Sequence, residues 1–165
     1  MDFRQGSKIS LLTQLNAMYT LVIGNVALWQ FSDPVALTGD ASGMDTKIKL
    51  TALDGNTTYS GNRTFKYNRL SLATLKSNYP TRPTLPLSGV ARVYDCLPYL
   101  LKTTGILFSQ ADLEDADVVV GQDGLITIPL TAKATSILWS GSTQIVSGGL
   151  PHISLAITRP YFDWS

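Results

Sequence analysis

Residues that carry catalysis are scarce in this chain. Of its 165 residues, His152 is the one histidine and Cys96 the one cysteine. These types supply the usual general base near neutral pH and the most nucleophilic side chain. His152 follows a Gly-Gly-Leu-Pro stretch at the start of an apolar segment, and Cys96 falls on the apolar face of a predicted helix, where cysteine packs as a small hydrophobic residue. We expect both to be structural, and we predict no catalytic residue.

Serine and glycine patterns support the same prediction. Ser60 and Ser140 each precede a glycine, but neither has the glycine two positions before the serine that the nucleophile elbow of hydrolases requires. The glycines are dispersed at turns, and no glycine-rich loop joins a strand to a long helix, as nucleotide-binding motifs require. We therefore predict no enzymatic activity and no cofactor.

Acidic side chains gather at one place, residues 112–117, which read Asp-Leu-Glu-Asp-Ala-Asp. An EF-hand calcium loop needs oxygen ligands at alternating positions, a glycine at the sixth position and a glutamate at the twelfth. This run fits none of those requirements. We interpret it as a solvated turn between a helix and a strand, and we predict no metal site.

Composition bounds the fold that must position these residues. The 13 basic and 12 acidic residues give a net charge of +1, and 44% of the residues are hydrophobic against 15% charged. Such a chain can bury a core, and it lacks the charge excess of nucleic-acid-binding or polybasic membrane-binding proteins. Its 18 threonines, 15 serines and one glutamate favour strands and turns over long helices. We expect no direct contact with nucleic acid or membrane.

Cysteine usage and the first apolar stretch exclude two further features. A single cysteine cannot form an internal disulfide, which fits a reducing compartment. The apolar run at 21–28 contains Gly24 and Asn25 and is shorter than the roughly 20 residues that span a membrane. We therefore expect neither an export signal nor a membrane anchor.

Short sequence blocks from the first half of the chain return in the second half. Residues 48–52 (Ile-Lys-Leu-Thr-Ala) return at 128–132 (Ile-Pro-Leu-Thr-Ala), and residues 59–61 (Tyr-Ser-Gly) return at 139–141 (Trp-Ser-Gly), both 80 positions later. Upstream of these blocks the offset becomes 82; the matched pairs there are Leu15 with Leu97, Met18 with Leu100, Phe31 with Leu113, and Asp33 with Asp115. Matches at one offset predict a tandem duplication of a module of about 65 residues.

Each module reads as one short helix packed on a small antiparallel sheet, an α+β fold that is mainly antiparallel β. Apolar spacing predicts a helix from residue 11, with Ser10 as its N-cap, and a second from about Asp95 to Gly105 with Pro98 in its first turn. Alternating patterns between turn signals predict the strands, at 26–31, 46–53, 63–67, 118–120, 125–132, 143–146 and 153–157.

Three prolines separate the modules. Pro80, Pro83 and Pro86 recur at intervals of three, which favours an extended, semi-rigid spacer. We therefore divide the chain into a first module at 1–77, a proline-rich linker at 78–90, and a second module with an aromatic tail at 91–165.

Aromatic side chains fall into two groups. Most of those in repeat strands or at repeated positions are predicted to be core; this group is Trp29, Tyr59, Phe65, Tyr67 and Trp139. The other group is Tyr161, Phe162 and Trp164, which lie within the last five residues and have no partner in the first copy. Either this tail folds back as a plug on its own module, or it docks on a neighbouring subunit. These three residues are the interface candidates.

Short motifs of both modules are similar to those of a known family. They lie at 46–52, 59–61, 67–70 and 72–75 in the first module, and at 97–98, 111–113, 130–133 and 139–141 in the second. Together they resemble small tandem-repeat virion structural proteins of large tailed bacteriophages. The resemblance implies a non-catalytic component of the particle, present in many copies and made in the host bacterial cytoplasm.

We therefore expect a structural or assembly protein of a tailed phage particle, located in the virion as part of a capsid or tail. Its expected partners are other virion structural proteins in a symmetric assembly. A receptor- or glycan-binding appendage module of a phage tail is the alternative, because exposed aromatic residues on small β modules stack on sugars.

Overall fold

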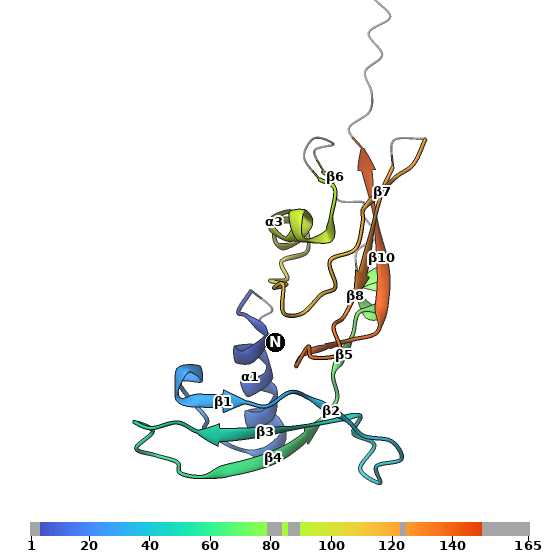
Figure 1. Cartoon of the computed structure of the whole chain (residues 1–165). Coiled ribbons are helices and arrows are strands. Elements are labelled where there is room, and N and C mark those ends of the chain that lie inside the picture. The colour runs from blue at the N-terminus through green and yellow to red at the C-terminus, as the bar shows by residue number, and fades with distance from the viewer. Residues whose placement is uncertain (1–3, 79–83, 86–89, 123–124, 150–165) are drawn as a thin grey trace, which may run out of the picture.

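The computed structural model describes residues 4–78, 84–85, 90–122 and 125–149. Within them the chain has an α+β fold with mostly antiparallel strands, as predicted. It has three α-helices, where the sequence predicts one in each half. Figure 1 shows the two four-stranded sheets at opposite ends of the molecule, with helix α1 beside the first and helix α3 beside the second. The polypeptide passes from the first half to the second at strand β5.

The first half is a helix followed by a sheet. Its elements are α1 (Ser7–Tyr19), the 3-10 turn η1 (Val26–Leu28), β1 (Trp29–Phe31), β2 (Val35–Ala36), β3 (Thr46–Ala52) and β4 (Asn62–Tyr67). Strand β3 is central: β4 pairs with one of its edges, and β1 and β2 pair with the other, all antiparallel. Ile48 and Leu50 alternate with Lys47 and Lys49, so the apolar side chains face the core and the lysines face outward.

The second half also has a helix followed by a sheet, after an extra crossing segment. That segment consists of β5 (Leu70–Ser71), α2 (Ala73–Asn78) and β6 (Thr84–Leu85); then follow α3 (Val93–Thr104), β7 (Val119–Val120), β8 (Ile126–Thr131), β9 (Trp139–Ser140) and β10 (Ser142–Gly149). Strand β8 pairs antiparallel with β7 and β10. The crossing segment makes two parallel pairings, β5 with β9 and β6 with β10.

The central hairpins of the two halves have the same register. Every pair of the β3–β4 ladder, from Thr46–Tyr67 to Thr51–Asn62, recurs 80 positions later in the β8–β10 ladder. The turn between the strands also recurs, because Gly61 and Gly141 have positive φ angles of 75° and 73°. Only glycine adopts this conformation without strain, so both turns depend on it.

Upstream of these hairpins the predicted offset of 82 is wrong, and the strand pairing has an offset of 84. The pair Val35–Lys47 of the first sheet corresponds to the pair Val119–Thr127 of the second. Likewise, the pair Trp29–Ala52 corresponds to the pair Leu113–Ala132. The difference of four residues (84 minus 80) falls in the loops at 37–45 and 121–125, where changes in length cost little.

Both helices begin earlier than their sequences predict. Helix α1 starts at Ser7 with Gly6 as its N-cap, and Ser10, the predicted cap, is buried inside the helix. Helix α3 starts at Val93, so Pro98 lies beyond the first turn and not within it. The predicted end of α3 is confirmed, because Gly105 closes the helix in a left-handed conformation.

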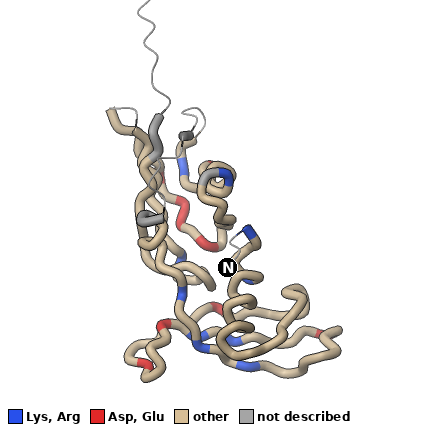
Figure 2. Tube along the Cα trace, turned by 180° about the vertical axis from the view of Figure 1, so that it is seen from behind, with Lys and Arg blue, Asp and Glu red and all other residues tan. Residues whose placement is uncertain are grey.

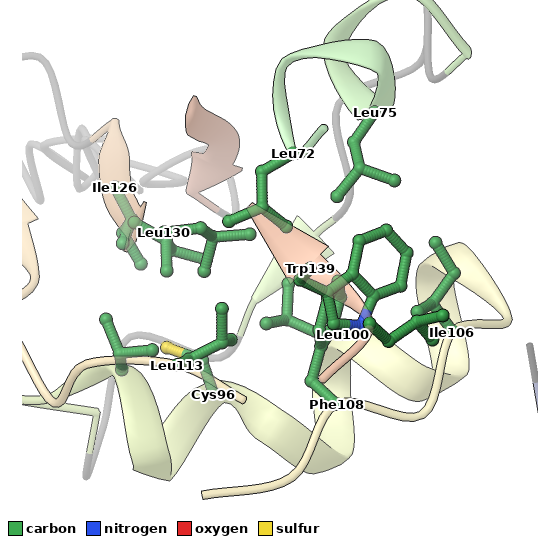
Figure 3. Packing of buried hydrophobic residues seen from close by; sticks show 13 residues of the cluster. Leu72, Leu75, Cys96, Leu100, Ile106, Phe108, Leu113, Ile126, Leu130 and Trp139 are labelled. Carbon is green, nitrogen blue, oxygen red and sulfur yellow. The ribbon is translucent and has the colours of Figure 1, made fainter. Parts of the chain in front are cut away.

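Two clusters of buried side chains form the core. The first joins α1 to β3 and β4 through residues such as Leu11, Leu15 and Leu50. The second joins α3 to β8 and β9, and it includes Leu72 and Leu75, which come from the crossing segment. Figure 3 shows these two leucines facing Trp139 across the cluster. The core of the second half is therefore completed by residues from the range 1–77, which the sequence assigns to the first module.

The two halves also touch directly. The hydroxyl of Tyr67, on the last residue of β4, donates a hydrogen bond of 2.6 Å to the carbonyl oxygen of Ile137. The Ile137 side chain packs against the first cluster. Tyr67 is fully buried, and burial raises the pKa of its phenol, so the hydroxyl stays protonated as a donor. These contacts couple the two cores.

Two predicted features lie wholly or largely outside the described residues. The strand predicted at 153–157 is one of them. The other is the linker at 78–90, of which the structure describes residues 78, 84–85 and 90. Thr84 and Leu85 pair with β10, so this part of the predicted spacer is a sheet strand.

We predict that the two halves unfold together. Leu50→Ala and Leu130→Ala remove fully buried side chains from register-equivalent strand positions, and each should lower the free energy of unfolding by about 2–5 kcal/mol. Urea unfolding followed by circular dichroism should show one shared transition for both variants. Val22→Ala, at an 83% exposed position, should change the free energy by less than about 0.5 kcal/mol. Two separated transitions would contradict the coupling of the cores.

Candidate functional site

A cleft of about 680 Å³ lies between the two halves. One wall comes from the start of α1 and from β1, with Lys8, Ile9 and Phe31. The other wall comes from the second half, with Asp112 and Ile137. Apolar surface predominates in the cleft, and one of its charged groups, the Lys8 ammonium, lies 5.4 Å from the centre of the Phe31 ring.

Asp112 is the polar centre of this cleft. Its side chain is 2% exposed, and its carboxylate accepts hydrogen bonds from three hydroxyls and one backbone N–H. The donors are Ser7 Oγ at 2.7 Å, Ser109 Oγ at 2.6 Å, Ser109 N at 3.0 Å and Ser136 Oγ at 3.2 Å. A buried carboxylate needs such donors to replace its lost hydration. Asp112 therefore ties the start of α1 to two loops of the second half.

Two other carboxylates of the acidic run, Asp115 and Asp117, bind residues at the start of α3. Arg92 donates from Nε to Asp115 at 2.6 Å and from a terminal nitrogen to Asp117 at 3.0 Å. Burial acts to raise the pKa of Asp115, but the hydrogen bond from Arg92, together with the Tyr94 N–H and the charge of Arg92, outweighs it and lowers the pKa. The interpretation of 112–117 as a solvated turn is wrong for Asp112, whose hydrogen-bond network gives its burial a physical reason.

The structure describes the surroundings of Cys96 and not those of His152. Cys96 is fully buried on α3, where it contributes to the second core cluster, and His152 lies outside the described residues. The interface candidates Tyr161, Phe162 and Trp164 lie outside them too. No group of three histidine, cysteine, aspartate or glutamate side chains in the described part of the chain could hold a metal ion.

The repeated aromatic positions differ between the halves. Phe65, Tyr67 and Trp139 are buried, as predicted. Tyr59, the counterpart of Trp139, is 37% exposed, although its ring lies 5.5 Å from that of Trp29. Tyr59 is therefore an exception among these aromatic residues, because β5 pairs beside Trp139 but no strand of the described residues pairs beside Tyr59.

The backbone beside Tyr59 forms an open edge. In the second half, Leu70 N donates to Leu138 O at 2.8 Å and Leu72 N donates to Ser140 O at 2.9 Å, which pairs β5 with β9. The corresponding acceptors in the first half are the carbonyls of Thr58 and Ser60. Within the ranges that the structure covers, no strand pairs with residues 58–60. We call residues 58–60 the open edge of the first half.

The face of the first sheet that points away from its core is basic. Lys47, Lys49 and Lys66 alternate with the buried residues of β3 and β4, and Lys66 pairs with Asp40. Figure 2 shows this run of basic positions along the first sheet. No helix in the described part of the chain is long and apolar enough to cross a membrane. The surface features of the first half are therefore a basic sheet face and an open strand edge.

We predict that Asp112 is a structural anchor. Asp112→Asn places an amide nitrogen among groups that donate hydrogen bonds, so it should lower the free energy of unfolding by about 1–3 kcal/mol. Asp33→Asn is the matched control, because Asp33 lines the same cleft but is exposed. Chemical denaturation measures both. Equal stability of the two variants would contradict the anchoring role.

We predict that the Cys96 thiol is inert in the folded protein. Burial, with a smaller effect from Asp95, raises its pKa to about 11, so at pH 8 very little thiolate is present. A thiol-specific reagent at pH 8 should label native Cys96 far more slowly than the same residue in urea. Rapid labelling of the native chain would show that the second core opens readily.

One comparison with known proteins identifies a family. No curated protein and no solved structure matches the chain. The match that is found covers residues 10–161, and thus includes both sheets and the crossing segment. On that match, the chain belongs to a family of unknown function, DUF7941.

Proposed function

We propose that this chain is a non-enzymatic structural or assembly subunit of a tailed phage particle, built from two copies of one module, and that it binds other virion proteins. The observation that carries the proposal is the crossing segment. Strand β5 and helix α2 follow the first sheet in sequence, yet they pair with β9 and pack against β10 and the second core. Modules that complete one another in this way are suited to serial assembly.

The duplication part of the proposal is supported by the strand registers. The hairpins recur at an offset of 80, and the outer strands recur at 84. A common register arising independently in two unrelated sheets would require the same turn, the same ladder and the same edge strand in each. Duplication of one module explains all three at once.

The phage part of the proposal is supported by the resemblance of both modules to small tandem-repeat virion structural proteins. In such a particle, the partners of this chain are other protein subunits. The open edge of the first half and the exposed apolar pair Val119 and Val120 on edge strand β7 are surfaces of the kind that such partners cover.

Mass spectrometry of purified virions tests this function. Virions from infected cells should be banded through successive density gradients, and peptides of this chain should stay at a constant ratio to the major capsid protein. A host cytoplasmic protein serves as the control, because its peptides should decline with each gradient. Loss of this chain in parallel with the host protein would refute a structural role in the particle.

A further inference from the structure

The segment after β10 repeats the crossing segment. Residues 70–73 read Leu-Ser-Leu-Ala, and residues 153–156, which are 83 positions later, read Ile-Ser-Leu-Ala. Lys76 likewise corresponds to Arg159. The offset exceeds that of the hairpins by three residues, which is a small difference for a connecting loop. Residues 153–156 therefore match the start of a crossing segment, although Thr158 stands where the crossing segment has Leu75. They follow the second half as residues 70–73 follow the first.

The crossing segment has a defined role in the described structure. Leu70 and Leu72 donate the two backbone hydrogen bonds that pair it with residues 138–140. The side chains of Leu72 and Leu75 are 0% and 4% exposed, because they fill the second core beside Trp139 (Figure 3). The segment thus supplies both a strand and part of a core to the half that follows it.

Among the described residues, no such donor pairs with the first half. Its open edge presents the carbonyls of Thr58 and Ser60 where the second half accepts hydrogen bonds from β5. Its core is also smaller, with 8 buried residues in the first cluster against 13 in the second. The side chain that the donor would cover, Tyr59, is 37% exposed, whereas Trp139 is 2% exposed.

A chain does not readily complete its own first half. Figure 1 shows β10 running away from the first sheet, so that its last residue lies at the far end of the molecule. Three residues separate Gly149 from Ile153, and a connection of that length spans at most about 14 Å. The open edge of a second copy is the site that residues 153–159 can reach without refolding.

We propose that residues 153–159 of one chain bind the open edge of the first half of the next chain. Ile153 N donates to Thr58 O and Leu155 N donates to Ser60 O, as Leu70 and Leu72 do within one chain, while the Leu155 side chain covers Tyr59. The donor and acceptor surfaces differ, so the contact is head-to-tail, and repetition gives a closed ring or an open filament. This inference deepens the proposed assembly role by naming a second copy of the chain as a partner.

The first test measures self-association by sedimentation. The wild-type chain should form oligomers whose mass rises with concentration, and Leu155→Asp should return it to the 17.9 kDa monomer. Val35→Asp is the matched control, because it places the same charge on an exposed valine of strand β2, outside the proposed contact, and should associate as the wild type does. A monomeric wild type, or a Leu155→Asp variant that still associates, would overturn the proposal.

The second test locates the contact. Ser60 and Ser154 correspond to the paired residues Ser140 and Ser71, so Ser60→Cys and Ser154→Cys single variants, when mixed, should be joined by a short bis-maleimide into a dimer linked between residues 60 and 154. The double variant should give a ladder of oligomers. The wild type, with its one buried cysteine, controls for background. A link within one chain, or no link between residues 60 and 154, would overturn the proposal.

Thermal unfolding separates the remaining outcomes. A lower unfolding midpoint for Leu155→Asp with no change of mass would place the segment on its own chain as a plug, and so exclude docking between chains. If the chain is monomeric but is retained in virions, head-to-tail binding fails and the assembly role stands. If it forms head-to-tail oligomers but is absent from virions, the assignment to the particle fails and the contact stands.

Discussion

The parallel pairing of β5 with β9 is the interaction on which the two-part architecture depends. It delivers Leu72 and Leu75 to a core that is otherwise built from α3, β8 and β9. Without those side chains, Trp139 would lose the apolar cover that Tyr59 lacks in the first half. A strand that pairs over a separation of about 70 residues also fixes where the second sheet lies relative to the first. The chain is therefore a pair of linked units in which the second cannot be complete without the first.

Asp112 fixes the opposite side of the same junction. Three hydroxyls and a backbone N–H surround its carboxylate, and one of the hydroxyls belongs to Ser7 at the start of α1. Hydrogen bonds to a buried charge are directional, whereas packed leucines tolerate sliding. The crossing leucines supply apolar contact, and Asp112 with Tyr67 sets the angle at which the halves meet.

The sequence predictions that the structure confirms rest on local patterns, which are the alternation of residues in strands and the glycines at turns. Alternating residues in β3 and β8, and the glycines at positions 61 and 141, define strands and turns through interactions between neighbours in sequence. The helix starts were missed because Gly6 and Arg92 carry no strong capping signal, and Ser10 has the residue type of a cap while lying inside a helix. Asp112 and Leu72 were missed for another reason: their partners lie far away in sequence, and no local period encodes a contact over that distance.

The crossing segment also has a consequence for synthesis. A ribosome releases the first half before the second exists, and residues 70–78 emerge with two leucines whose partners are still unmade. Until β9 and α3 have been synthesised, those leucines stay exposed and strand β5 has no partner strand. Domains of this kind mature in the order of translation, and the interval before the second half folds is the period when the nascent chain is most open to pairing with a neighbour.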